Sequence, residues 1–129
     1  MSASDVPRPT DAELEILNVM WALGSCTVRQ VHETLSQHRD MGYTTILKQM
    51  QIMFEKGLVA RDDSQRSHVY RAKQKEQTTQ RQLLTDLLAR AFGGSTEKLV
   101  LQALSAKKAT RDELAEIRRM LNELDGGEQ

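Results

Sequence analysis

The side chains best suited to bind a ligand lie between positions 43 and 66. Hydroxyl, amide and ammonium groups follow one another closely there, and such groups bond to the base edges and phosphates of DNA. An arginine in a polar segment then offers a guanidinium to phosphate or to the minor groove, although it could also be an exposed loop arginine beside Asp62 and Asp63. The residues that we expect to contact DNA are Tyr43, Thr44, Thr45, Lys48, Gln49 and Arg66.

A helix and a hairpin are predicted to carry these side chains. Apolar residues recur at spacings of three and four over residues 43–56, as on one face of an α-helix, and Gly57 then ends the helix. This stripe consists of Ile46, Leu47, Met50, Met53 and Phe54. Residues 58–61 and 68–71 have strand character, and the polar residues 62–67 predict a turn between them. The segment therefore predicts a recognition helix followed by a wing.

Two shorter helices precede this segment, and each has a start signal. Thr10 and Glu13 form a capping box, in which each side chain bonds the backbone amide of the other residue. Thr27 and Gln30 repeat the pattern, and because a helix start offers backbone amides to phosphate, Thr27 joins the expected DNA contacts. The apolar stripes are Leu14, Leu17, Met20, Trp21 and Leu23, then Val28, Val31 and Leu35. Three helices and a hairpin in this order predict a winged helix-turn-helix domain.

The charge distribution agrees with a DNA-binding surface, although the chain is neutral overall. The 129 residues include 18 lysines and arginines and 18 aspartates and glutamates. From Tyr43 to Lys73, however, six basic residues stand against three acidic ones, an excess of three positive charges. A local excess attracts phosphate whatever the total charge, and a solvated helix face is the alternative explanation.

The composition argues against several other classes of function. The single cysteine, Cys26, has no second thiol and no closely spaced histidine, so we expect no disulfide, no metal and no cofactor. No apolar run approaches the length of a membrane span and no secretory signal is visible, which predicts a soluble cytoplasmic protein. We expect no enzyme, because paired carboxylates, a nucleophile motif and a glycine-rich phosphate loop are missing from the sequence.

The last part of the chain changes to helices with leucine seams. Arg81–Phe92 predicts one helix, Ser95 or Thr96 can cap a second, and the capping box of Thr110 and Glu113 starts a third. A segment this short buries its apolar seams poorly on its own, so we expect two copies to pair in a symmetric homodimer. The alternative is that these helices fold back on their own winged helix. The expected dimerisation residues are Leu83, Leu84, Leu87, Leu88, Phe92, Leu99, Val100, Leu104, Leu114, Ile117, Leu121 and Leu124.

The order and spacing of these motifs resemble the penicillinase-repressor family, the winged-helix repressors of β-lactamase and methicillin-resistance operons. The matching residues are 9–17, Met20, Trp21, Val31, 43–46, 56–59, Arg66, Tyr70, 92–95, Leu99 and Val100. The resemblance implies that Arg66 is the wing arginine and that the C-terminal helices form the dimerisation domain. The family commonly has a glycine just before that arginine, where this chain has Gln65.

The resemblance also bears on how repression is relieved. Repressors of the β-lactam circuits are cut by a membrane-bound sensor protease at an Asn-Phe bond inside the dimerisation domain. Gapless alignment from Leu99 and Val100 places Gln102 and Ala103 at that bond, so the expected side chains are absent. The resemblance thus implies a sensor protease as a partner and marks Gln102 and Ala103 as the candidate cleavage position. The copper-sensing relatives use a C-terminal cysteine cluster, which this chain lacks.

These observations predict a mainly α-helical protein with a small β-hairpin. We expect a flexible N-terminal arm over residues 1–9, a winged-helix DNA-binding domain over 10–73 and a three-helix dimerisation region over 74–129. The expected function is that of a homodimeric transcriptional repressor that occupies a palindromic, double-stranded DNA operator. The alternative is a winged-helix protein–protein adaptor without DNA affinity, which a test of salt-sensitive binding to mixed-sequence DNA would distinguish.

Overall fold

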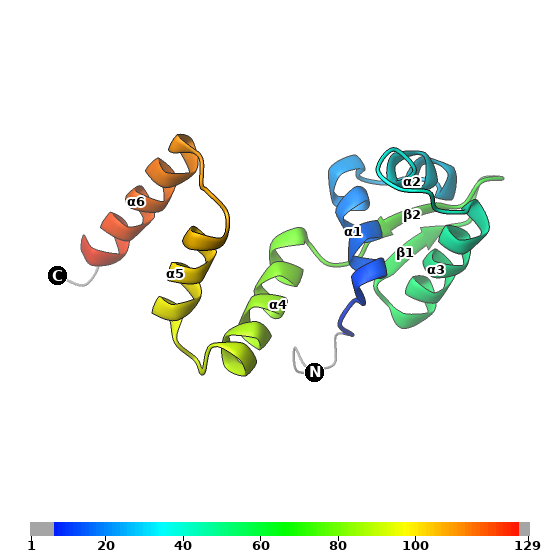
Figure 1. Ribbon diagram of the computed structural model, residues 1–129. Helices are drawn as coiled ribbons and strands as arrows, with labels where there is room; N and C mark the ends of the chain where they lie inside the picture. Colours follow the sequence, from blue (N-terminus) through cyan, green and yellow to red (C-terminus); the bar gives the residue numbers. More distant parts are fainter. Residues whose placement is uncertain (1–6, 127–129) are drawn as a thin grey trace. The chain divides into compact units, whose positions relative to one another are not determined.

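The computed structural model describes residues 7–126, which divide into two compact units, one up to Leu83 and one from Leu84. The first unit holds α1 (Asp11–Leu23), α2 (Val28–Leu35), α3 (Tyr43–Lys56), β1 (Val59–Asp62) and β2 (Val69–Ala72) (Figure 1). Helix α4 (Glu76–Ala91) spans the division, and α5 (Thr96–Ala106) and α6 (Arg111–Gly126) follow it. A mainly α-helical fold with one hairpin is confirmed; the predicted arm over 1–9 lies mostly outside the described residues.

The core of the first unit lies where three helices and the hairpin meet. Helix α1 packs against α2, α3 and β2, and α3 also contacts α2 and β1. Ile16, Val31, Ile46 and Met50 are fully buried at this junction. Removing such apolar side chains from water is the main stabilising contribution in a small domain, so this junction fixes how α3 is placed.

The predicted starts of α1 and α2 are confirmed. The Thr10 hydroxyl accepts the Glu13 amide at 3.2 Å, and the Glu13 carboxylate accepts the Thr10 amide at 2.9 Å. Thr27 and Gln30 form the same capping box. Helix α3 ends as predicted at Gly57, whose φ of 85° lies in the left-handed region that favours glycine.

The buried face of α1 differs from the predicted stripe. Ile16 and Val19, which the stripe omits, are buried, whereas Leu23 is 49% exposed. Because α1 contacts α2, α3 and β2 at once, its buried face is wider than a single stripe. Trp21 lies at the edge of the core, where its Nε1–H donates to the Gln74 carbonyl at 3.0 Å. This bond joins α1 to the segment that leads into α4.

The hairpin is antiparallel, and each strand begins one residue later than predicted. Its register pairs Val59 with Ala72. Cys26, between α1 and α2, adds a bridge to β2: its amide donates to the Tyr70 carbonyl at 2.9 Å and its carbonyl accepts the Tyr70 amide at 2.7 Å. Since both residues are buried, this bridge ties the wing to the start of α2.

Helix α4 is longer than the apolar pattern indicated. It begins at Glu76 rather than Arg81, because the polar residues of its first turns are helical without contributing to an apolar stripe. Thr79 is buried in these turns, and residues 74–83 group with the first unit. The predicted functional boundary after Lys73 stays a prediction.

Helices α5 and α6 have the predicted caps but no buried residue. The Ser95 hydroxyl accepts the Lys98 amide at 3.1 Å, and Thr110 and Glu113 form a capping box. None of the side chains from Leu84 to Gly126 is buried within the chain. The apolar side chains of this unit therefore stay in contact with solvent.

Candidate nucleic-acid-binding surface

Helix α3 turns a polar face away from the core. Its buried residues are Ile46, Met50 and Met53. With about 100° between successive residues, the exposed residues on the other side of the helix are Thr44, Thr45, Lys48, Gln51 and Glu55. The predicted contacts Thr44, Thr45 and Lys48 thus lie on the free face. Gln49 is half-buried at the margin of the core, whereas Gln51, three residues after Lys48, shares the free face and could have been selected by that spacing.

A groove of about 490 Å³ lies between the start of α2, one side of α3 and the wing. It brings together three of the predicted contacts, Thr27, Tyr43 and Arg66. It is also lined by residues that the sequence pattern did not single out as contacts, among them Arg29, Gln51, Ser67 and His68. Arg29 could have been noticed from its place in the first turn of a helix expected at a phosphate. The sequence pattern did not indicate that His68 would line a groove together with residues of α3.

The start of α2 uses the polar groups of Thr27 internally. The Thr27 amide donates to Gln30 Oε1 at 2.9 Å, and the Thr27 hydroxyl accepts the Gln30 amide at 3.2 Å. The other amides of this first turn, those of Val28 and Arg29, have no intrahelical carbonyl within reach. A phosphate at this helix start would therefore meet those two amides rather than the amide of Thr27.

His32 holds the start of α3. Its Nε2 lies 2.9 Å from the carbonyl oxygen of Met41, and because a carbonyl only accepts, Nε2 carries the proton and donates. The rings of His32 and Tyr43 meet edge to face, with centroids 5.7 Å apart and planes at 78°. Tyr43 is 45% exposed and lines the groove. His32 thus contacts both the turn before α3 and the first side chain of α3.

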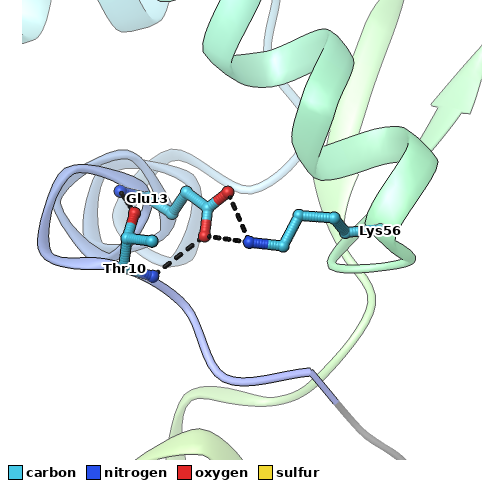
Figure 2. Close-up of polar contacts among 3 residues, drawn as sticks. All are labelled: Thr10, Glu13 and Lys56. Carbon is cyan, nitrogen blue, oxygen red and sulfur yellow. Dashed lines mark hydrogen bonds and ion pairs between the residues drawn. The ribbon is translucent and has the colours of Figure 1, made fainter.

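A buried carboxylate holds the other end of α3. Glu13, only 2% exposed, accepts bonds from Lys56 Nζ at 2.8 and 2.9 Å as well as from the Thr10 amide (Figure 2). Burial alone would raise the pKa of Glu13, but Lys56 and Thr10 together outweigh it and lower that pKa. Lys56 was counted in the basic excess of this region, and its ammonium is engaged in this ion pair.

The wing turns without a glycine. Asp62 Oδ1 accepts the Ser64 amide at 2.9 Å, an Asx-type turn that also lowers the pKa of Asp62. Within residues 7–126 only glycines have a positive φ. Gln65, which stands where the resembling family commonly has glycine, therefore causes no left-handed strain.

Arg61 is engaged inside the wing. Its Nε lies 2.7 Å from Asp63 Oδ1, and its guanidinium carbon lies 4.2 Å from the centroid of the Phe54 ring. Phe54, predicted to face the core, is instead 37% exposed, and the Arg61 guanidinium covers one part of its ring. The same Asp63 oxygen lies 3.3 Å from Nδ1 of His68.

Three exposed cations remain around the groove and α3. Within the part of the chain that the structure describes, Arg29, Lys48 and Arg66 form no ion pair. They come from α2, α3 and the wing, respectively. Their charges are available to an anionic partner, whereas those of Lys56 and Arg61 are compensated locally.

The structure also bears on the single cysteine, on metal binding and on membrane crossing. Burial raises the pKa of the Cys26 thiol to about 11, which keeps it protonated near neutral pH. Over residues 7–126, no group of three or more histidines, cysteines, aspartates or glutamates could hold a metal ion. The helices in that range include none that is both long and apolar enough to cross a bilayer.

The predicted dimerisation residues form partly open apolar faces. Those exposed by more than a third are Leu84, Leu87, Val100, Leu104, Leu114, Leu121 and Leu124. The other residues of the predicted set are half-buried: Leu83, Leu88, Phe92, Leu99 and Ile117. Leu101 and Met120, which the seams omitted, are also exposed. Gln102 and Ala103, the candidate cleavage position, are exposed inside α5.

Three helices and a wing around one apolar core, with a polar face on α3, define this molecule as a winged-helix protein. A family model described as penicillinase repressor matches residues 9–123, and the chain belongs to that family.

Individual relatives agree with this assignment. The transcriptional regulator BlaI of Mycobacterium tuberculosis is 32% identical over 121 residues, which are 93% of this chain and 87% of the relative. The solution structure of the DNA-binding domain of the repressor BlaI is 27% identical with a TM-score of 0.51, and covers 57% of this chain and 89% of that domain. A structure of Bacillus licheniformis BlaI in monomeric form, in complex with the blaP half-operator, is 27% identical with a TM-score of 0.50 and the same coverage.

Proposed function

We propose that this protein is a cytoplasmic, homodimeric transcriptional repressor that binds a palindromic DNA operator. The observation that carries the proposal is the presence, around the groove and α3, of three exposed cations that form no ion pair within the described residues, Arg29, Lys48 and Arg66. Relatives support it, since the Bacillus licheniformis BlaI was solved on a half-operator and the Mycobacterium tuberculosis relative is a transcriptional regulator.

Helix α3 is the element that we place in the major groove. Thr44 and Thr45 then bring hydroxyls to base edges, where they both donate and accept hydrogen bonds, and Lys48 neutralises a phosphate. Tyr43 lies at the entry of the helix, and Gln49 at the margin of this face adds an amide. On the wing, Arg66 reaches the adjoining backbone or the minor groove. Bases are thus read from α3, while Lys48 and Arg66 hold the backbone.

Dimerisation through residues 74–129 is the second part of the proposal. Leu87 on α4 and Leu121 on α6 are 49% and 58% exposed in the single chain, and the other residues of these seams are at most half-buried. A second copy offers a self-complementary apolar surface related by a two-fold axis. Two winged helices carried by one dimer match an operator with two-fold symmetry.

The direct test is the salt dependence of DNA binding. Replacing Lys48 or Arg66 by Ala should weaken binding and reduce the slope of log K against log salt by about one unit per contact in each half-site. Thr45→Ala should instead blur base preference with little change in slope. Arg39→Ala is the matched control, because Arg39 is paired with Glu15 at 2.8 Å and does not line the groove. Unchanged slopes in both basic variants would remove these residues from the interface.

An adaptor that binds protein but not DNA is the competing function. Such a protein would show no salt-dependent affinity for duplex DNA of any sequence. The uncompensated cations favour the repressor, because the DNA backbone offers a regular row of negative charges to pair with them.

A sensor protease is the further partner that we include in the proposal. Gln102 and Ala103 are exposed, but the bond between them lies within α5 (Thr96–Ala106). Since proteolytic cutting concentrates in exposed, poorly ordered segments, cleavage there would require α5 to unwind locally. Incubation with the candidate protease and mass determination of the fragments would show whether this bond is cut.

A further inference from the structure

The groove between α2, α3 and the wing has a cation on two of its sides. Arg29 lines it from the first turn of α2, and Arg66 lines it from the wing. Both side chains are exposed, and in the described part of the chain neither forms an ion pair. Tyr43 and Leu47 of α3 also line it. The groove thus combines two cations with aromatic and aliphatic side chains.

That combination suits a sugar-phosphate strand. Phosphates carry one negative charge each and pair with arginine, whereas the deoxyribose between them offers carbon atoms that can rest on aromatic and aliphatic side chains. A recognition helix in the major groove has one backbone strand along its flank, between that groove and the next. The flank of α3 that faces the wing is the side on which this groove lies.

We infer that the groove seats one backbone strand of the DNA, with Arg29 and Arg66 binding phosphates from opposite sides. The inference rests on the proposed function and extends it, because it assigns to Arg29 a phosphate contact and to α2 a part in fixing how deeply α3 enters the major groove. Gln51, which lines the same groove from the free face of α3, lies at the border between backbone and base edges.

A small anionic ligand is the other occupant to be tested. The groove volume of about 490 Å³ falls within the range of about 300–1,000 Å³ that ligand pockets span. Such pockets, however, enclose most of the ligand and present a few fixed polar groups. Arg29 and Arg66 are exposed on a surface that α2, α3 and the wing share, which favours an extended strand.

The experiment uses the full chain and an operator duplex selected from random-sequence DNA. Arg29→Ala should reduce the slope of log K against log salt by about one unit per half-site, and Arg29→Lys should retain most of it. Arg39→Ala, paired with Glu15 on α1, should keep the wild-type slope. Thermal unfolding of each variant shows that the fold is intact.

A scan with single methylphosphonate linkages locates the contact. Neutralising the phosphate bound by Arg29 should weaken binding of the wild type but should no longer weaken binding of Arg29→Ala, since one interaction cannot be lost twice. The phosphate that couples to Arg66 should lie on the same strand, within a few nucleotides of the phosphate that couples to Arg29.

A wild-type slope and an unchanged methylphosphonate profile in Arg29→Ala would overturn the inference while leaving the repressor proposal intact. Binding of free deoxynucleoside monophosphate to the groove, without a coupled phosphate in the duplex, would also overturn it. Absence of salt-dependent duplex binding by the wild type would instead refute the proposed function itself.

Discussion

The ionised carboxylate of Glu13 organises two helices of this small domain. At 2% exposure it is out of water, which costs free energy unless the charge is paired and hydrogen-bonded. Lys56 and the Thr10 amide supply those bonds. They hold the first turn of α1 against the last turn of α3, so the position of that last turn depends on the charge of Glu13.

Glu13→Gln should lower the free energy of unfolding by roughly 1–3 kcal/mol near neutral pH, because the amide keeps a hydrogen bond but loses the ion pair. The pKa of Glu13 is lower in the folded state, so its ionised form adds stability above its ordinary pKa of 4.5. This contribution is lost as the pH falls through the folded-state pKa. Denaturant titrations from about pH 7 down to about pH 3 should therefore show the two proteins converging in stability. A constant difference over that range would contradict the role assigned to the ion pair.

His32→Leu should weaken selective DNA binding without unfolding the protein. Leucine cannot donate to the Met41 carbonyl, so the turn before α3 and the Tyr43 ring lose a fixed support. We expect the ratio of operator affinity to mixed-sequence affinity to fall roughly 2- to 10-fold, which corresponds to the net free energy of one hydrogen bond. His32→Gln should restore most of it, since the glutamine amide nitrogen is as many bonds from Cβ as Nε2. Equal ratios for the leucine variant and the wild type would show that His32 does not position α3.

Contacts between residues that are close in the chain could be predicted from the sequence. The capping boxes at Thr10, Thr27 and Thr110 were predictable, because each joins residues three apart. The bond between Glu13 and Lys56 was not, because 43 residues separate them and only the tertiary fold brings them together. The groove position of His68 was missed for the same reason, whereas Arg29 could have been selected from its place in the first turn of α2.

At the scale of elements, the recognition helix is held at both ends by side chains from other helices. His32 on α2 contacts its start, and Glu13 on α1 bonds its last turn. Its middle is fixed by burial of Ile46, Met50 and Met53. An element fixed in this way can present Thr44 and Lys48 with little loss of conformational freedom on binding, which favours affinity.

The wing depends on a hydrogen bond between Asp62 and Ser64, inside the turn that residues 62–67 predict. Asp62→Ala removes the acceptor for the Ser64 amide, while Asp62→Asn removes the same charge and keeps an acceptor. The alanine variant should show faster hydrogen exchange at Ser64 and a smaller contribution of Arg66 to the salt slope; the asparagine variant should resemble the wild type in exchange. NMR exchange rates compare the two directly. Identical rates at Ser64 in both variants would show that the Asp62 turn does not order the wing.

Element boundaries were predictable to the extent that apolar periodicity marks them. Helix α3 and the hairpin lie within a residue of their expected positions, because glycine and alternating residues delimit them. Helix α4 begins earlier than its leucine seam, at Glu76, since a polar helical turn leaves no such mark. The width of the α1 core face, including Ile16 and Val19, required knowledge of the three elements packed against it.

At the scale of the whole molecule, the two units have opposite surface characters. The first unit buries its apolar residues and exposes cations near α3, whereas the second exposes its leucines and buries no residue between Leu84 and Gly126. A chain with one complete core and one open apolar surface is expected to gain stability from a second copy.

Leu121→Asp should therefore give monomers. The seam of α6 would acquire a charge that is costly to bury without a partner, while the winged-helix core, which α6 does not supply, stays intact. Asn122→Asp is the matched control, because it adds the same charge to the neighbouring position, off the seam. Sedimentation velocity should show monomers for the first variant and dimers for the second. Dimers of normal stability in Leu121→Asp would place the interface elsewhere.

The central claim is that one dimer reads two half-sites on the same side of the duplex, and half-site spacing tests it most directly. Because the two recognition helices are related by a two-fold axis, the half-site centres should be a whole number of helical turns apart, each of roughly 10 base pairs. Inserting about 5 base pairs between the half-sites turns one of them to the far side of the DNA and should abolish tight binding, whereas inserting about 10 should be less harmful. Undiminished affinity for the half-turn insertion would mean that the two winged helices bind independently, and would contradict the account.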